Sequence, residues 1–232
     1  MEQERAKQIQ TMFSRITRRY DLMNKVMTGG QDQAWRRIAA RELHLQPNGL
    51  VLDLATGTAD LAIAVREAWP GSRVIAADFS ETILRAGAAK VSERRLTGIE
   101  FAVGDALSLS FPDHAFDGIT NAFLLRNVVD LPRCLREMRR VTKPGGRVVC
   151  MEITHPQMPL FKQAFGLYFN KMVPLIGGVI SGDYKAYKYL PASLSKFPPA
   201  APLKQMMLDA GYREVSYRLL ALGTMAIHAG VA

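Results

Sequence analysis

The stretch from residue 50 to residue 60 reads Leu-Val-Leu-Asp-Leu-Ala-Thr-Gly-Thr-Ala-Asp, and it decides the fold of this chain. Its first half, Leu50 to Ala55, is a short apolar run interrupted only by Asp53, which is typical of a strand buried on both faces of a parallel sheet. Its second half is a turn of small residues around Gly57, where backbone and ligand can approach closely. The stretch predicts a strand, a ligand-binding turn and a helix, in that order.

Beyond residue 60 the same alternation continues, because short strand-like runs are followed by longer runs with helical periodicity. We expect further strands at residues 73–78, 99–103, 116–122, 148–153, 214–221 and 224–229. We expect helices at residues 61–69, 80–91, 131–141 and 203–210, the third of them stopped by Pro144-Gly145-Gly146. The sequence therefore predicts an α/β fold: a doubly wound, seven-stranded, mostly parallel sheet with helices on both faces and a Rossmann-like order.

Length and composition favour one domain. A chain of 232 residues, 48% of them hydrophobic, can close a full core but is too short for two ordinary domains, so residues 1–232 are predicted as one unit. Its apolar runs are interrupted well before the roughly 20 residues that a spanning helix needs. Met1 is followed by charged residues, unlike a signal peptide. We therefore expect a cytoplasmic protein.

The cysteines and histidines give no sign of a metal site. Cys134 and Cys150 lie inside apolar periodic patterns, which fits two packed thiols in a reducing compartment. The histidines are scattered singly along the chain, at His44, His114, His155 and His228. Because no Cys or His pair has the spacing of a zinc site, we expect no bound metal.

Two segments lie outside the alternating pattern. Residues 1–45 are predicted to form an N-terminal helical cap, and residues 156–200, rich in apolar and aromatic side chains, an insertion over the substrate site. The cap begins with arginines and apolar residues at helical spacing: Ile9, Met12, Phe13, Arg15, Ile16, Arg18, Arg19 and Tyr20. With a formal net charge of +9, these segments leave three uses open: packing against the domain, contact with an anionic inner membrane face, or a homodimer interface.

Acidic residues follow the first three predicted strands. Asp53 and Asp60 flank the turn at Gly57, Asp78 ends the second strand, and Asp105 follows the third. The glycines that seat a dinucleotide pyrophosphate are missing, and these acids would repel one. They suit S-adenosylmethionine, which has no phosphate but carries a sulfonium, an amine and ribose hydroxyls. In this interpretation Asp78 accepts the ribose hydroxyls, and Asp105 with the Ala106 amide faces the adenine edge.

Each acid also has an ordinary structural alternative. Asp60 would be favoured in the first turn of a helix by the helix dipole, and Asp105 is a common type of turn residue.

Four segments resemble the ubiquinone and menaquinone biosynthesis C-methyltransferases, a family of class I S-adenosylmethionine-dependent methyltransferases. Two of them, Tyr20-Asp21-Leu-Met23-Asn24 and Leu124-Leu-Arg126-Asn127, are specific to the family, whereas the glycine turn and Lys143-Pro144-Gly145-Gly146 identify only the class. The matching segments are Phe13 to Arg36, Leu52 to Asp60, Phe123 to Glu152, and Tyr187 to Gly230.

The resemblance implies methyl transfer from S-adenosylmethionine to a ring carbon of a prenylated hydroquinone such as demethylmenaquinol. A ring carbon becomes nucleophilic when the neighbouring phenol loses its proton, so the enzyme must stabilise a phenolate. We assign this role to Arg126, with Asn127 as an orienting hydrogen-bond donor and Asp32 as a proton acceptor. The alternative for Arg126 is a structural ion pair with Asp130 or Glu152. The expected cofactor-binding residues are Asp53, Gly57, Thr58, Asp78, Asp105, Ala106, Asn121 and Ala122.

The chain also departs from the family pattern. Thr28 and Asp32 stand where the family has Ser and His, and Ala59, Ala122 and Leu124 replace Gly, Ser and Gly. These changes favour an alternative substrate, a small soluble phenol or natural-product scaffold. A third hypothesis, an RNA-binding protein or an RNA methyltransferase, rests on net charge alone, and the Asn-Pro-Pro-Tyr type of clamp is absent at Asn121-Ala-Phe-Leu. We therefore expect no nucleic-acid partner.

Overall fold

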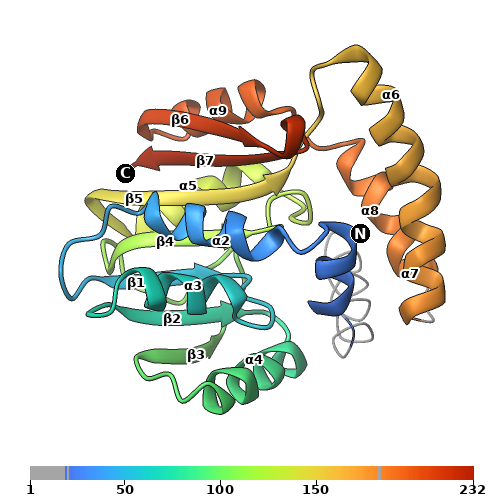
Figure 1. Ribbon diagram of the computed structural model, residues 1–232. Helices are drawn as coiled ribbons and strands as arrows, with labels where there is room; N and C mark the ends of the chain where they lie inside the picture. Colours follow the sequence, from blue (N-terminus) through green and yellow to red (C-terminus); the bar gives the residue numbers. More distant parts are fainter. Residues whose placement is uncertain (1–18, 20, 182–183) are drawn as a thin grey trace.

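The centre of the fold is a seven-stranded sheet with the strand order β3-β2-β1-β4-β5-β7-β6 (Figure 1). This computed structural model describes residues 19, 21–181 and 184–232. The strands are β1 (Leu50–Leu54), β2 (Arg73–Asp78), β3 (Ile99–Val103), β4 (Phe116–Ala122), β5 (Thr142–Ile153), β6 (Arg213–Leu220) and β7 (Met225–Val231). The first five strands run parallel, and β7 is antiparallel to both β5 and β6. The predicted fold class is confirmed.

The chain reverses its direction of travel across the sheet beside β1. Asp53 of β1 is paired with Ala76 of β2 on one side and with Thr120 of β4 on the other. After β1 the chain adds β2 and β3 in one direction, then returns to place β4 against the opposite edge of β1. In open α/β sheets ligands bind at such a switch point, outside the carboxyl ends of the strands.

Helices cover both faces of the sheet (Figure 1). They are α2 (Asp32–Arg41), α3 (Asp60–Ala68), α4 (Glu81–Glu93), α5 (Leu131–Val141), α6 (Pro159–Leu167), the π-helical turn η1 (Tyr168–Met172), α7 (Val173–Ser181), α8 (Tyr184–Leu194) and α9 (Ala200–Asp209), with a short turn η2 (Ala221–Gly223) before β7. A further helical segment occupies residues 21–27.

The apolar side chains of β1 pack into two hydrophobic clusters, one on each face of the sheet. Val51 packs in a cluster with α2 and α3, whereas its neighbour Leu52 packs in a second cluster with α5 and α9. Successive side chains of a strand point to opposite faces, so a strand covered on both faces must be apolar throughout. This is why the first half of the opening stretch predicts the fold.

Two features differ from the sequence expectations or fall outside the described residues. The helix α5 ends at Val141, and β5 begins at Thr142, so Pro144-Gly145-Gly146 lies inside the strand rather than at a helix stop. Gly145 has φ +82°, which a residue with a side chain rarely adopts. Most of the predicted basic lead segment, residues 9–18 and Tyr20, lies outside the described residues.

The segment at residues 156–200 is largely helical, and α6, α7 and α8 lie together beyond one end of the sheet (Figure 1). Among the helices built from described residues, none combines the length and the apolar character needed to cross a membrane.

Candidate active site

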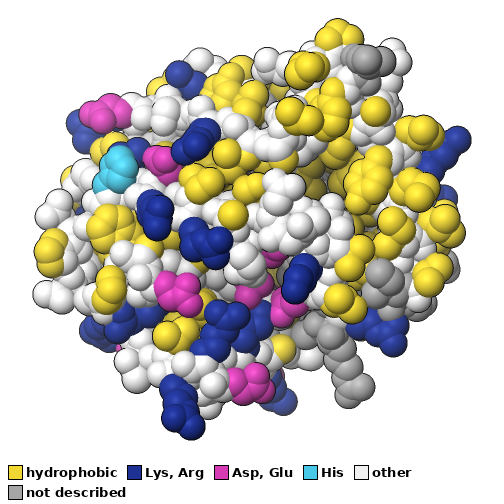
Figure 2. Space-filling model, viewed as in Figure 1, with side chains coloured by type: hydrophobic (Ala, Val, Ile, Leu, Met, Phe, Trp, Pro, Cys, Tyr) yellow, Lys and Arg dark blue, Asp and Glu magenta, His cyan; other side chains and the backbone are white. Residues whose placement is uncertain are grey.

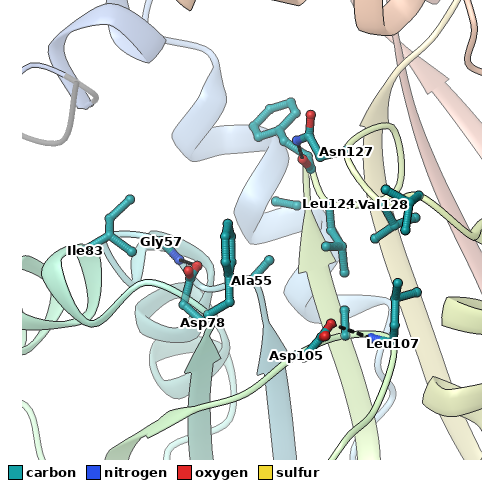
Figure 3. Close-up of a pocket in the computed structure, with 14 residues that line it drawn as sticks. Ala55, Gly57, Asp78, Ile83, Asp105, Leu107, Leu124, Asn127 and Val128 are labelled. Atoms are coloured by element: carbon teal, nitrogen blue, oxygen red, sulfur yellow. Dashed lines mark hydrogen bonds between the residues drawn. The ribbon is translucent and has the colours of Figure 1, made fainter. Parts of the chain in front are cut away.

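A cavity of about 140 Å³ opens at the carboxyl ends of β1, β2 and β4 (Figure 3). Its polar groups come from Asp78, Asp105 and Asn127, and the rest of its wall is apolar. The lining residues are Ala55, Gly57, Asp78, Phe79, Ile83, Asp105, Ala106, Leu107, Ala122, Phe123, Leu124, Asn127, Val128 and Val129. The cavity lies at the switch point, where the strand order predicts a ligand.

Asp78 is held rigidly at the end of β2. Its two carboxylate oxygens accept hydrogen bonds of 3.0 Å from the Gly57 and Ser80 amides. Figure 3 shows Gly57 and Asp78 joined on one wall of the cavity. Burial raises the pKa of Asp78, against the opposing effect of these backbone hydrogen bonds. Because a carboxylate oxygen accepts more than one hydrogen bond, Asp78 retains acceptor capacity for ribose hydroxyls.

Asp105 and Ala106 border the same cavity, where Asp105 lies across from Asp78 (Figure 3). The Asp105 Oδ1 atom accepts a 2.9 Å hydrogen bond from the Leu107 amide, so the turn role named as its alternative is present. The two roles are compatible, because the side chain is exposed and only one of its oxygens has this partner.

A second, smaller cavity of about 20 Å³ shares Ala55, Gly57 and Ala122 with the first. Asp53 borders it, but both Asp53 oxygens accept hydrogen bonds from hydroxyls, from Thr56 at 2.6 Å and from Thr120 at 2.7 Å. Burial raises the pKa of Asp53 to about 6, although these hydroxyls oppose the shift. The Asp53 carboxylate therefore links β1 to β4 through Thr120 and to the following turn through Thr56, at the base of the site.

The predicted cofactor residue Thr58 links the turn to the N-terminal segment. Its hydroxyl donates a 2.6 Å hydrogen bond to Asp21 Oδ1. Lys90 of α4 lies 2.5 Å from the other Asp21 oxygen and 2.8 Å from Asp60 Oδ1. Asp60 also occupies the first turn of α3, as its structural alternative predicted. These four residues fasten the helix at residues 21–27 over the turn that follows β1.

Arg126 and Asn127 lie on the loop after β4. The Arg126 guanidinium contacts Glu152 at 3.5 Å and lies 5.6 Å from the centre of the Phe123 ring. The ion pair with Glu152, one of the two partners named as an alternative, is thus present, whereas Asp130 caps α5. Arg126 does not line either cavity, and it reaches the larger one only through Phe123.

Asn127 borders the cavity directly. Its Nδ2 group already donates a 2.6 Å hydrogen bond to the Phe123 carbonyl. Its Oδ1 atom is buried and has no hydrogen-bond partner among the described residues. Because an amide nitrogen carries two N–H groups, the bond to the Phe123 carbonyl leaves one donor, and the orienting-donor role of Asn127 stays a prediction.

Two other predicted residues point away from the cavity. The Asn121 amide lies in the core, where it donates to Cys150 Sγ at 3.1 Å and Met138 Sδ at 3.4 Å. Successive residues of a strand face opposite sides, so Ala122 borders the cavity and the Asn121 side chain does not. Asp32 is buried on α2, where it accepts from Thr28 at 3.3 Å and lies 3.9 Å from Arg36.

Four residues of the site were not predicted: Asp21, Arg36, Lys90 and Phe123. Arg36 borders the smaller cavity, and Phe123 borders the larger one with a positive φ of 61°. Asp21 and Arg36 stand within segments that carry the family resemblance, which was the available signal. Lys90 gives no local signal, because a lysine on a surface helix is ordinary.

The fold and the cavity together define a class of protein. A doubly wound sheet with acids at the ends of β2 and β3, and without a pyrophosphate turn, suits the hydroxyls, amine and sulfonium of S-adenosylmethionine. The protein is a class I S-adenosylmethionine-dependent methyltransferase.

The particular family follows from comparison with known proteins. The model of the ubiE/COQ5 methyltransferase family matches residues 1–232, and the chain belongs to that family. It is 42% identical over 229 residues to a demethylmenaquinone methyltransferase of Roseiflexus castenholzii, covering 98% of this chain and 94% of that protein. It is 44% identical over 219 residues to a demethylmenaquinone methyltransferase of Thermus thermophilus, covering 94% of this chain and 99% of that protein.

The fold is shared with solved structures of lower sequence similarity. The crystal structure of a SAM-dependent methyltransferase from Thermotoga maritima superposes with a TM-score of 0.68 at 16% identity, covering 96% of this chain and 99% of that one.

Proposed function

We propose that this protein transfers a methyl group from S-adenosylmethionine to a ring carbon of a prenylated hydroquinone, demethylmenaquinol, in quinone biosynthesis. The observation that carries the proposal is the largely apolar cavity wall, on which Asn127 is one of only three polar or charged side chains among the described residues. An apolar wall accommodates an aromatic ring, and a polar side chain on it can orient the ring hydroxyl. The names of the two relatives above support the same substrate class.

S-adenosylmethionine supplies an electrophilic methyl group when it is bound. For the protein, the remaining tasks are to hold the ring and to favour the ionised phenol. The remaining Asn127 N–H would donate to the ring oxygen, and the Arg126 charge behind Phe123 would favour the phenolate. The phenol proton, and the ring proton that the methyl group displaces, would pass to solvent water. Glu152 partly offsets that charge, because it lies 3.5 Å from Arg126.

The direct test incubates the purified protein with S-adenosylmethionine and demethylmenaquinol, followed by mass spectrometry of the extracted quinone. We expect the mass gain of one methylene group, and no gain with the Asp78→Ala variant. A tail-free naphthalenediol separates this proposal from the alternative of a small soluble phenol, which Ala122 and Leu124 favour. Methylation of the tail-free diol alone would establish the alternative.

We also propose that α6, α7 and α8 dock on an anionic phospholipid bilayer and form a lid through which the prenyl tail enters. Hydrophobic side chains gather over these helices in Figure 2, and the exposed ones include Met158, Leu167, Leu175 and Val179, the last 77% exposed. Lys162, Lys171 and Lys188 are exposed along the same helices, and no described residue from 159 to 194 is acidic. An exposed apolar face with basic residues beside it suits an anionic interface. A second copy of the chain is the alternative occupant.

A further inference from the structure

Arg36 is a buried arginine on the wall of the smaller cavity. It comes from the middle of α2, is only 4% exposed, and borders the cavity together with Asp53, Gly57 and Thr58. Arginine is rarely buried without a strong anionic partner, because an unpaired buried charge is costly. The position of Arg36 beside the turn after β1 therefore requires an explanation.

The partners of Arg36 within the protein leave most of its hydrogen-bonding capacity unused. Within the part of the chain that the structure describes, its one ion pair is with Asp32, whose Oδ2 atom lies 3.9 Å from Nε, beyond hydrogen-bond distance. Among the described residues, Nε has no hydrogen-bond partner. The guanidinium carbon lies 5.7 Å from the centre of the Phe123 ring, so Asp32 and Phe123 fix its position without satisfying its donors.

The charge of the surroundings identifies the missing partner. The two adjoining cavities are bordered by four carboxylates, from Asp53, Asp60, Asp78 and Asp105. Among the described residues that line them, Arg36 is the only cation. Lys90, which contacts Asp60 on the smaller cavity, is already bonded to both Asp21 and Asp60.

S-adenosylmethionine carries one anionic group, the carboxylate of its methionine portion, beside an ammonium and a sulfonium. The acids of the site suit the two cationic groups and the hydroxyls, whereas the carboxylate needs a cation. A planar guanidinium with free donors matches a carboxylate by two parallel hydrogen bonds. We propose that Arg36 binds the carboxylate of the cofactor's amino-acid portion, an inference that rests on S-adenosylmethionine being the cofactor.

The experiment measures binding by calorimetry, without any turnover. The probes are S-adenosylhomocysteine and its decarboxylated analogue, which differ only in the carboxylate. We expect the unmodified protein to prefer S-adenosylhomocysteine by about 10- to 100-fold, the effect of a charge-assisted hydrogen bond. In Arg36→Gln this preference is expected to disappear, while affinity for the decarboxylated analogue stays within about twofold of the original.

Arg37→Gln is the matched control, because Arg37 is the exposed neighbour on the same helix. It is expected to keep the full preference. Arg36→Lys keeps the positive charge but loses the planar guanidinium that makes two parallel hydrogen bonds. It is expected to retain a reduced preference for S-adenosylhomocysteine over the decarboxylated analogue. Equal affinities of the unmodified protein for the two ligands would overturn the inference even if Arg36→Gln does not fold, as would an unchanged preference in a folded Arg36→Gln. Failure of the unmodified protein to bind either ligand would instead overturn the cofactor assignment.

Discussion

Thr58 and Asp21, 37 residues apart in the chain, are joined by a 2.6 Å hydrogen bond from the Thr58 hydroxyl to the Asp21 carboxylate. The bond ties the helical segment at residues 21–27 to the turn that follows β1. Lys90 reinforces it from α4, at 2.5 Å from Asp21. The N-terminal segment is therefore attached at the edge of the site by side chains from two other elements.

Removing this hydroxyl should loosen the segment selectively. Thr58→Val keeps the shape of a buried side chain but removes the donor, at a cost of about 1 kcal/mol. We expect amide hydrogen exchange at residues 21–27 to accelerate about fivefold, while exchange in β1 and β4 is unchanged. Ser92→Ala, an exposed position on α4, is the control. Uniform acceleration across the sheet would show that the bond supports global stability instead.

Asp78→Asn should weaken cofactor binding by at least about tenfold. The substitution removes the charge and converts one of the two acceptor oxygens, which hold the Gly57 and Ser80 amides, into a donor. Calorimetric titration with S-adenosylhomocysteine measures the loss. Asp209→Asn, an exposed change on α9, should bind normally. Undiminished binding by Asp78→Asn would remove Asp78 from the site.

Substitutions in the buried pair of Arg126 and Glu152 should show whether Arg126 contributes to catalysis independently of its effect on the free energy of unfolding. Arg126→Gln alone leaves Glu152 buried without its ion-pair partner, so we expect a loss of stability of about 3 kcal/mol. The double variant Arg126→Gln/Glu152→Gln restores a neutral pair and should recover most of that stability. Its kcat should still fall about a hundredfold while cofactor affinity is unchanged, because the cation near the phenol is lost. A double variant with normal kcat would leave Arg126 a purely structural role.

The contribution of Asp53 to the free energy of unfolding should fall as pH rises between about 4 and 6. Its pKa is raised by burial from 3.8 to about 6 in the folded protein, so in this window the folded state retains a proton that the unfolded state releases. Two pKa units at 1.36 kcal/mol each give about 3 kcal/mol across the window.

Denaturant unfolding of the unmodified protein and Asp53→Asn, repeated from pH 4 to pH 7, measures this contribution. The advantage of the unmodified protein over the variant should shrink by about 3 kcal/mol as pH rises. If the free energies of unfolding of the two proteins varied with pH in parallel, the pKa of Asp53 would not be raised in the folded protein.

Charged substitutions on the apolar face should abolish membrane binding. Leu175 and Val179 on α7 are 55% and 77% exposed. We expect Leu175→Asp/Val179→Asp to lose flotation with vesicles containing phosphatidylglycerol, while Leu208→Asp on α9, 37% exposed, floats normally. Sedimentation of the unmodified protein as a dimer that these substitutions dissociate, without vesicle binding, would assign the face to a second copy.

The order of strands and helices could be predicted from the sequence because the periodicities that determine it are local. Phe116–Ala122 and Arg73–Asp78 occur where the apolar runs predict them, and the fold class follows from their alternation with helices. The acids Asp78 and Asp105 could also be assigned to the cavity, since the carboxyl ends of parallel strands meet at one edge of a sheet.

The direction in which each side chain points was decided only by the tertiary structure. Asn121 and Ala122 are neighbours in the chain, yet only Ala122 borders the cavity, because the pleat of β4 turns them to opposite faces. The Asn127 amide donates one of its two N–H groups to the Phe123 carbonyl, a contact that the sequence does not predict. Arg36 and Lys90 lie at the site because α2 and α4 pack around the turn after β1. These contacts join segments far apart in the chain, so they exist only once the sheet has brought its strand ends together.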